Sequence, residues 1–241
     1  PEFYNLRYGK NVRIIGAIFL ILAGVLNMGV FLKTGAIFLE AIFGDANISL
    51  NLIMIVLLVL VLFYTMMGGM LSIIITDYIQ FVVLSSGLLI ATFISISEIG
   101  WNNIFNSFKL EKNFNPIVNP DFGYDYIVWM VIIGFASAVI WPTATTRALA
   151  MKDHHAVKKQ YVWSSISFLI RFIIPSFLGI CAFVYFQDKS FDFSSNTLEA
   201  MPLFLREILP IGILGLVVAG MLSAFMSTHD SYLLCWSTII V

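Results

Sequence analysis

The residue types best suited to chemistry in this chain lie near its end, between Ala224 and Ser231. Ala224, Ser227, Thr228 and Ser231 are spaced by three and four, so they share one face of a helix. Hydroxyl and carbonyl oxygens are ligands for a hard cation such as sodium, and the Ser227–Thr228 pair with the Ala224 carbonyl offers three. Alternatively, these hydroxyls only bond to the carbonyl four residues back. Asp230, at the same depth, weakens that alternative.

A second polar group interrupts an apolar segment at Asp77, with Thr76 before it and Gln80 one turn later. A charged group in hydrocarbon is costly, so it indicates a functional site. Asp77 and Gln80 share a helix face and favour an ion pathway. The other interpretation is an interfacial carboxylate that stabilises the start of the helix.

Arg171 and Asn27 also lie within apolar segments. Arg171 is roughly 15 Å into its segment at 1.5 Å per residue, too deep to reach water easily. Pro175 deprives the Arg171 carbonyl of its helical partner and should kink the helix. We expect Arg171 to pair with a protein carboxylate or an anionic substrate. Asn27 could contact substrate, although a buried asparagine more often bonds a neighbouring helix.

Composition shows which kind of protein must position these groups. Hydrophobic residues make up 60% of the 241 and charged residues only 11%, against about 25% in soluble domains. Several apolar runs of about 20 residues are long enough to cross a bilayer. The sequence therefore predicts an all-α integral membrane protein. The net charge of −1 and the lack of a basic tract or zinc motif exclude nucleic acid as the expected partner.

No nucleophile–base arrangement appears in the apolar segments, so we expect no enzyme, no cofactor and no metal other than sodium. Asp153, His154 and His155 could form a membrane-surface enzyme or metal site, but a solvated loop is the simpler interpretation. Cys181 and Cys235, each inside an apolar run, are expected to be small core residues.

Six membrane spans can be drawn, separated by loops that define an orientation. Positive loop residues favour the cytoplasmic side; they are Arg7, Lys10, Arg13, Arg147, Lys152, Lys158 and Lys159. The alternate loops carry Asp45, Glu98, Glu111, Asp121, Asp125, Asp188, Asp192, Glu199 and Glu207. We expect a multi-pass plasma-membrane protein with spans over residues 12–43, 50–67, 71–96, 126–149, 161–186 and 208–241. A tight turn is predicted at 64–69, and a short external helix at 196–209.

Four stretches give this chain a family resemblance. They are Pro1-Glu2-Phe3-Tyr4 with Arg7-Tyr8; Tyr64-Thr65, Gly68-Gly69 and Thr76-Asp77 to Gln80; Arg147-Ala148-Leu149-Ala150 with Lys152; and Pro210, Gly212, Gly215 and Ala224 to Ser231. In this order they resemble the sodium:solute symporters. The resemblance implies one partial symporter domain over residues 1–241, part of a LeuT-like inverted-repeat core whose sites lie between broken helices. We expect an internal part of a longer protein, because the chain starts without methionine and ends in an apolar run.

The resemblance also implies roles for particular residues. Ala224, Ser227 and Thr228 would bind sodium, the co-substrate. Asp77, Asp230 and Ser231 would form a second ion site or an ion path. Asn27, Gly134, Ser137 and Arg171 fall where relatives contact substrate. Gly134 and Ser137 stand where sugar carriers have Asn and Tyr, which argues against a sugar, and Arg171 favours a carboxylate-bearing solute.

The predicted function is sodium-coupled symport of a small organic solute by alternating access across the bilayer. Two alternatives stay open: coupling to protons through Asp77 or Asp230, and a transporter-like sensor domain joined to a signalling module.

Overall fold

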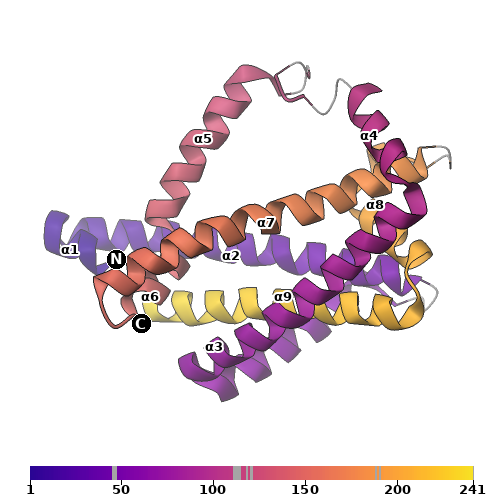
Figure 1. The fold of residues 1–241 in the computed structure, drawn as a ribbon. Coiled ribbons are helices and arrows are strands. Elements are labelled where there is room, and N and C mark those ends of the chain that lie inside the picture. Colours follow the sequence, from indigo (N-terminus) through magenta and orange to yellow (C-terminus); the bar gives the residue numbers. More distant parts are fainter. Residues whose placement is uncertain are drawn as a thin grey trace. The chain divides into compact units, whose positions relative to one another are not determined.

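The structure, a computed structural model, describes residues 1–44, 48–110, 115–117, 119, 122–187, 189 and 191–240, without the side chains of 67–73, 108–110, 139–140 and 194–196. Helices fill most of this described part, and no strand occurs in it (Figure 1). The predicted all-α class is therefore confirmed. Four acidic residues of the orientation argument, Asp45, Glu111, Asp121 and Asp188, fall outside the description.

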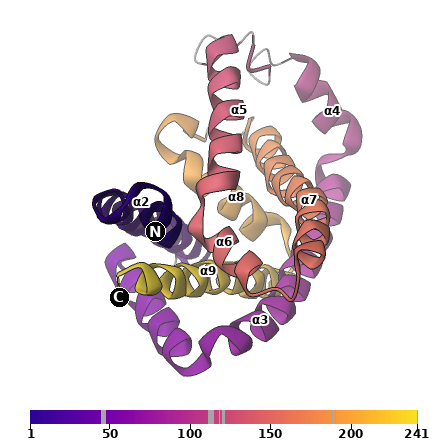
Figure 2. The same cartoon turned by 90° about the vertical axis from the view of Figure 1, so that its left-hand side faces the viewer.

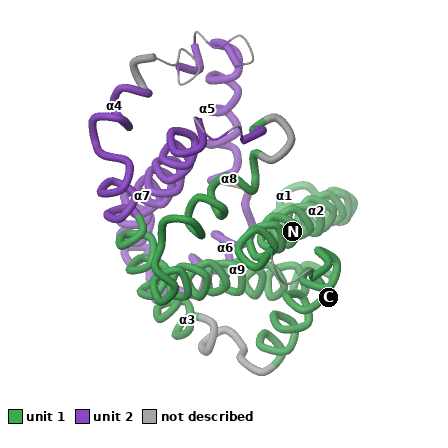
Figure 3. The backbone as a smooth tube through the Cα atoms, turned by 90° about the vertical axis from the view of Figure 1, so that its right-hand side faces the viewer, with its two compact units in different colours: residues 1–91, 193–241 green, residues 92–192 purple. Residues whose placement is uncertain are grey.

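The chain divides into two compact units (Figure 3). Unit 1 comprises residues 1–91 and 193–241, and unit 2 comprises residues 92–192. The long helix α3, Leu50–Ile99, contributes to both. Each unit is described by itself below.

In unit 1, α2 (Lys10–Ile42) and α9 (Ile211–Ile240) lie side by side (Figures 1 and 2). A Cβ placed on Gly24 would come within 2.1 Å of the Trp236 ring, and one on Gly35 within 3.0 Å of Phe225. Residue 24 pairs with 236 and residue 35 with 225, so the helices are antiparallel. Small residues allow such close helix packing in membranes.

Two shorter helices complete this packing. α1 (Glu2–Tyr8) packs against α2 and is separated from it by Gly9, whose φ of 85° suits glycine. α8 (Phe193–Ile208) also packs on α2 and buries Phe204 and Leu205 completely. It covers the range predicted for a short external helix to within a few residues.

The predicted tight turn at residues 64–69 is wrong. The backbone of α3 stays helical through these residues, so they do not interrupt the secondary structure. The hydroxyl groups of Tyr64 and Thr76 nevertheless contact each other. In a straight helix, residues twelve apart are separated by about 18 Å along the axis. The axis of α3 must therefore change direction between these two residues.

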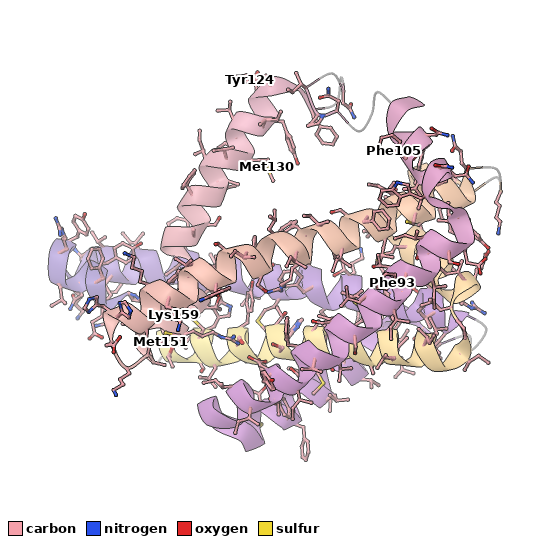
Figure 4. The ribbon with its side chains drawn as sticks, in the orientation of Figure 1. Phe93, Phe105, Tyr124, Met130, Met151 and Lys159 are labelled. Carbon is pink, nitrogen blue, oxygen red and sulfur yellow. The ribbon has the colours of Figure 1, made fainter. Side chains whose placement is uncertain are left out.

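In unit 2, Gly100 (φ 82°) separates α3 from α4 (Trp101–Leu110), which packs on α7 (His154–Phe186). Trp101 stacks on Phe177 with ring centroids 6.3 Å apart. Leu178 and Cys181 are buried in α7, as expected for Cys181. Many other large apolar side chains of this unit are exposed; Phe93, Phe105, Tyr124 and Met130 are labelled in Figure 4.

The segment predicted as one span over 126–149 consists of two helices, α5 (Gly123–Ile140) and α6 (Pro142–Leu149). Trp141 between them is extended, with φ −67° and ψ 115°. Pro142 explains the break, because a proline disfavours helical backbone in the residue before it and has no N–H for the Ala138 carbonyl.

His154 and His155, expected in a solvated loop, are instead the first residues of α7. The Asp153 carboxylate accepts a 2.7 Å hydrogen bond from the Ala156 backbone N–H. Asp153 therefore caps the helix, a common use of aspartate at this position.

Five helical segments are long and apolar enough to cross a membrane in the described part of the chain: Lys10–Ile42, Ile74–Ile99, Gly123–Leu149 (α5 and α6 together), His154–Phe186 and Ile211–Ile240. The shorter apolar stretch Leu50–Met66 corresponds to the predicted second span. The chain is thus a multi-pass membrane protein; its predicted orientation stays a prediction.

Candidate functional site

The predicted sodium ligands lie in the middle of α9, all half-buried. Thr228 Oγ1 donates a 2.9 Å hydrogen bond to the Ala224 carbonyl oxygen. Ser231 Oγ donates a 2.9 Å bond to the Ser227 carbonyl. These are the bonds to the residue four back that the alternative interpretation of the hydroxyls expects.

The same geometry suits a cation. Adjacent oxygen ligands of a cation with metal–oxygen distances of about 2.3–2.6 Å, as for calcium, lie roughly 3–3.5 Å apart. The Ala224 and Thr228 oxygens, 2.9 Å apart, are close to this spacing. A hydroxyl that donates its proton keeps its lone pairs, and a carbonyl has two. The bond between them therefore leaves both oxygens able to bind sodium.

Asp230 is fully buried, with a relative exposure of 0%. Its Oδ1 accepts a hydrogen bond of 3.3 Å from Ser231 Oγ. A buried carboxylate must be balanced by a counter-charge or protonated. A cation bound nearby is one source of such balance, so its position agrees with a role beside the ion.

His229, for which no role was predicted, is also buried at 1% exposure. Its Nδ1 lies 3.0 Å from the Phe225 carbonyl oxygen on α9, and its Nε2 lies 3.3 Å from the Met28 carbonyl oxygen on α2. His229 could have been identified as a candidate from the sequence, because it is a histidine in the middle of a 30-residue apolar helix.

A cavity of about 320 Å³ adjoins this part of α9 inside unit 1. Ala224, Thr228 and His229 are among the residues that line it. The remaining wall is mainly apolar; it comprises Phe31, Thr34, Gly35, Phe38 and Leu39 of α2, Leu57 of α3, Leu198, Met201 and Pro202 of α8, and Met221, Leu222 and Phe225 of α9. The cavity gives two candidate sodium ligands a space in which an ion or solute can approach.

Asp77 and Gln80 are half-buried on α3, and each has a side-chain oxygen with almost no exposure. Further along, a Cβ on Gly87 would come within 3.4 Å of Leu216, and one on Gly220 within 2.9 Å of Leu84. The helices cross antiparallel there. Because the helices are antiparallel, the residues that precede the crossing in α3, Gln80 and Asp77, extend from it in the same direction as the residues that follow it in α9, Ala224 and Thr228.

Asn27, half-buried on α2, directly precedes Met28, whose carbonyl faces His229. The structure thus joins the Asn27 segment to the candidate sodium segment of α9 within unit 1.

The other predicted substrate residues belong to unit 2. Gly134 and Ser137 are exposed on α5, just before the break at Trp141. Arg171 is exposed on α7, and Pro175 lies inside that helix as predicted. The description brings none of these three together with the α9 cluster.

No group of three or more His, Cys, Asp or Glu side chains suited to a metal ion occurs within the described residues. His154 and His155 are exposed at the start of α7, beside the capping Asp153.

The profile of the sodium:solute symporter family matches residues 1–241. The chain belongs to this family. Among curated proteins, the chain is 28% identical over 195 residues to the sodium/sialic acid symporter SiaT of Proteus mirabilis, covering 74% of this chain and 39% of that protein.

It is also 26% identical over 270 residues to the sodium/glucose cotransporter of Vibrio parahaemolyticus, with coverages of 99% and 48%. The human sodium/iodide cotransporter is 24% identical over 258 residues, covering 100% of this chain and 39% of the relative. No solved structure matches the chain. The chain spans between about two fifths and one half of the length of these relatives.

Proposed function

We propose that this symporter couples the entry of sodium to the transport of a small organic solute by alternating access. The observation that carries the proposal is the pair of oxygens on Ala224 and Thr228, which lie 2.9 Å apart beside a cavity. Membership of the sodium:solute symporter family supports sodium as the ion.

In this proposal the Ala224 carbonyl and the hydroxyls of Ser227 and Thr228 bind the sodium ion. Asp77, Asp230 and Ser231 form a second ion site or line the ion's path. The burial of Asp230 and its bond from Ser231 support this assignment. The remaining ligands come from the rest of the complete protein.

The driving force follows from electrostatics and linkage. A monovalent cation that crosses the membrane gains about 2.3 kcal/mol per 100 mV of potential, in addition to its concentration gradient. Sodium drives the solute only when each ligand raises the affinity for the other. Packing of α9, which carries the proposed ion ligands, against α2, which carries Asn27, supports such coupling.

For the solute, we propose contacts from Asn27, Gly134, Ser137 and Arg171, with the Arg171 guanidinium pairing a carboxylate. The printed names of the relatives include sialic acid, glucose and iodide, so they do not select one solute class. We also propose that the multi-pass chain lies in the plasma membrane, with its basic loops on the cytoplasmic side.

The test uses the complete protein in proteoliposomes with an inward sodium gradient and labelled sialic acid, proline and glucose. We expect sodium-dependent uptake of at least one carboxylate-bearing solute. Thr228→Ala should raise the sodium half-saturation about tenfold, equivalent to 1.4 kcal/mol of lost binding. Thr238→Ala removes an exposed hydroxyl bonded to the Cys235 carbonyl of the same helix and is the matched control.

An unchanged sodium half-saturation in Thr228→Ala would remove Thr228 from the site. Uptake driven by a proton gradient alone would replace sodium by protons in the coupling. Absence of gradient-driven uptake of any of the three solutes would favour a sensor.

A further inference from the structure

The Nε2 atom of His229 faces the Met28 carbonyl oxygen of α2 at 3.3 Å. On its own helix, Nδ1 lies 3.0 Å from the Phe225 carbonyl, and the His229 and Phe225 rings are 4.0 Å apart. The ring is 1% exposed. The ring therefore packs against Phe225 of its own helix while Nε2 faces the next helix.

The chemistry of the Met28 contact defines the role of the ring. A carbonyl oxygen only accepts hydrogen bonds, so bonding Met28 requires a proton on Nε2. A neutral imidazole has one N–H, so in this tautomer Nδ1 makes no hydrogen bond to the Phe225 carbonyl; both bonds together require the imidazolium. A directional donor sets the axial position of one helix against the other, whereas apolar contacts tolerate sliding and rotation. An interhelical bond of this kind contributes modestly to membrane protein stability, so losing it should alter geometry more than folding.

Packing on both sides of His229 keeps α2 and α9 together without that bond. Gly24 lies against Trp236 toward one end, and Gly35 lies against Phe225 toward the other. Phe31 and Tyr232 meet edge to face at 6.1 Å between them. The helix pair thus has an apolar contact surface, within which His229 supplies a specific polar link.

The contact between His229 and Met28 joins a segment proposed to bind sodium to a segment proposed to bind the solute. Thr228, the neighbour of His229, is a proposed sodium ligand, and Asn27, the neighbour of Met28, is a proposed solute contact. The contact therefore connects the α9 segment that carries the proposed ion ligands to the α2 segment that carries Asn27.

We propose that His229 is a positioning residue of the transport cycle, whose bond to the Met28 carbonyl transmits occupation of the sodium site on α9 to the Asn27 segment of α2. This inference rests on the proposed function. In this role His229 acts through Met28 and its neighbour Asn27.

The test follows the Asn27 segment directly, with sodium alone as the probe. In the complete protein in detergent, Asn27→Cys is labelled with a maleimide with and without sodium, and equilibrium binding of radioactive sodium is measured on the same samples. When Asn27→Cys is the only substitution, sodium should change the labelling rate about fivefold or more, which is the lower end of the usual coupling between sites.

Two variants remove the donor, His229→Met and His229→Leu, and His229→Gln restores one. We expect the first two to lose the sodium effect on labelling while the half-saturation for sodium binding stays unchanged. His229→Gln should recover the effect at least in part. His154→Ala, at an exposed histidine outside this site, should behave as the wild type.

The outcomes separate the two claims. Absence of saturable sodium binding in the wild type would overturn the proposed function, and this inference with it. If sodium binds but labelling in the Met and Leu variants keeps its sodium dependence, or the wild type shows none, only the positioning role is wrong. If both variants lose sodium binding while Gln keeps it, His229 stabilises the fold and does not transmit the ion's occupation.

Discussion

Units 1 and 2 differ in how they hold their polar residues. In unit 1, His229 and Asp230 are buried, and their helix packs against α2 with glycines at the close approaches. In unit 2, none of residues 123–138 of α5 is buried, and Arg171 on α7 is exposed. The ion-binding candidates on α9 are thus positioned by packing within unit 1, whereas the substrate candidates of unit 2 are all exposed.

Exposed apolar side chains do not explain this difference, since lipid covers them as well as protein does. The polar residues are informative about this difference, because a charged side chain in hydrocarbon costs at least about 2.5–3.5 kcal/mol on insertion scales. Arg171 lies between the exposed apolar residues Ile170 and Phe172. It must therefore meet water, a carboxylate or a substrate in the complete protein.

The largest effect is expected on stability, when one glycine of each unit is replaced by alanine: Gly24 in unit 1 and Gly134 in unit 2. Gly24→Ala places a methyl group 2.1 Å from the buried Trp236 ring and should cost about 1–3 kcal/mol through overpacking. Gly134→Ala meets nothing within 4 Å and should stabilise α5 by up to about 1 kcal/mol. Thermal unfolding of the complete protein in detergent measures both.

Equal losses of stability from the two alanines would show that α5 is packed as closely as α2 in the complete protein. The contrast between the units would then belong only to this part of the chain.

A smaller effect is expected on solute affinity from Arg171→Gln. Removing the guanidinium should raise the KM for carboxylate-bearing solutes about tenfold, a typical 1.4 kcal/mol, because a charge-assisted bond is lost. Initial uptake rates measure this. Lys159→Gln, an exposed cation on the same helix, is the control. If KM is unchanged but the protein is less stable, Arg171 pairs with a protein carboxylate instead.

The smallest effect is expected from Asp153→Ala at the start of α7. Losing its 2.7 Å bond to the Ala156 N–H should cost about 1 kcal/mol of stability, the usual value of an N-cap. Transport should continue at the wild-type rate. Asp153→Asn, which can still cap, should restore stability. Loss of transport in both variants at unchanged stability would instead indicate a chemical role for Asp153 and the adjacent histidines.

Much of the fold follows from the sequence, because lengths of apolar runs dictate membrane helices. The positions of α2, α8 and α9 agree with prediction to within a few residues. Two features did not follow from hydropathy. Helix α3 continues through Gly68 and Gly69, where glycine suggested a turn. The segment predicted as one span over 126–149 instead breaks at Trp141–Pro142. At Trp141–Pro142, proline chemistry was the stronger guide.

The candidate site was predictable only where periodicity applies. Spacings of three and four placed Ala224, Thr228 and Ser231 on one helix, and the structure adds the bond between the Ala224 and Thr228 oxygens. His229 was missed because its partner, Met28, is 201 residues away in sequence. Spacing along one helix carries no information about a backbone carbonyl on another, so the α2–α9 link required the structure.

The central claim is that sodium binds to α9, and equilibrium binding of radioactive sodium to the complete protein in detergent tests it most directly. The wild type should show saturable binding, and the Ser227→Ala/Thr228→Ala double variant should lose it, while Ser237→Ala/Thr238→Ala on the same helix retains it. Saturable binding that survives in the Ser227→Ala/Thr228→Ala variant, or its absence from the wild type, would contradict the account.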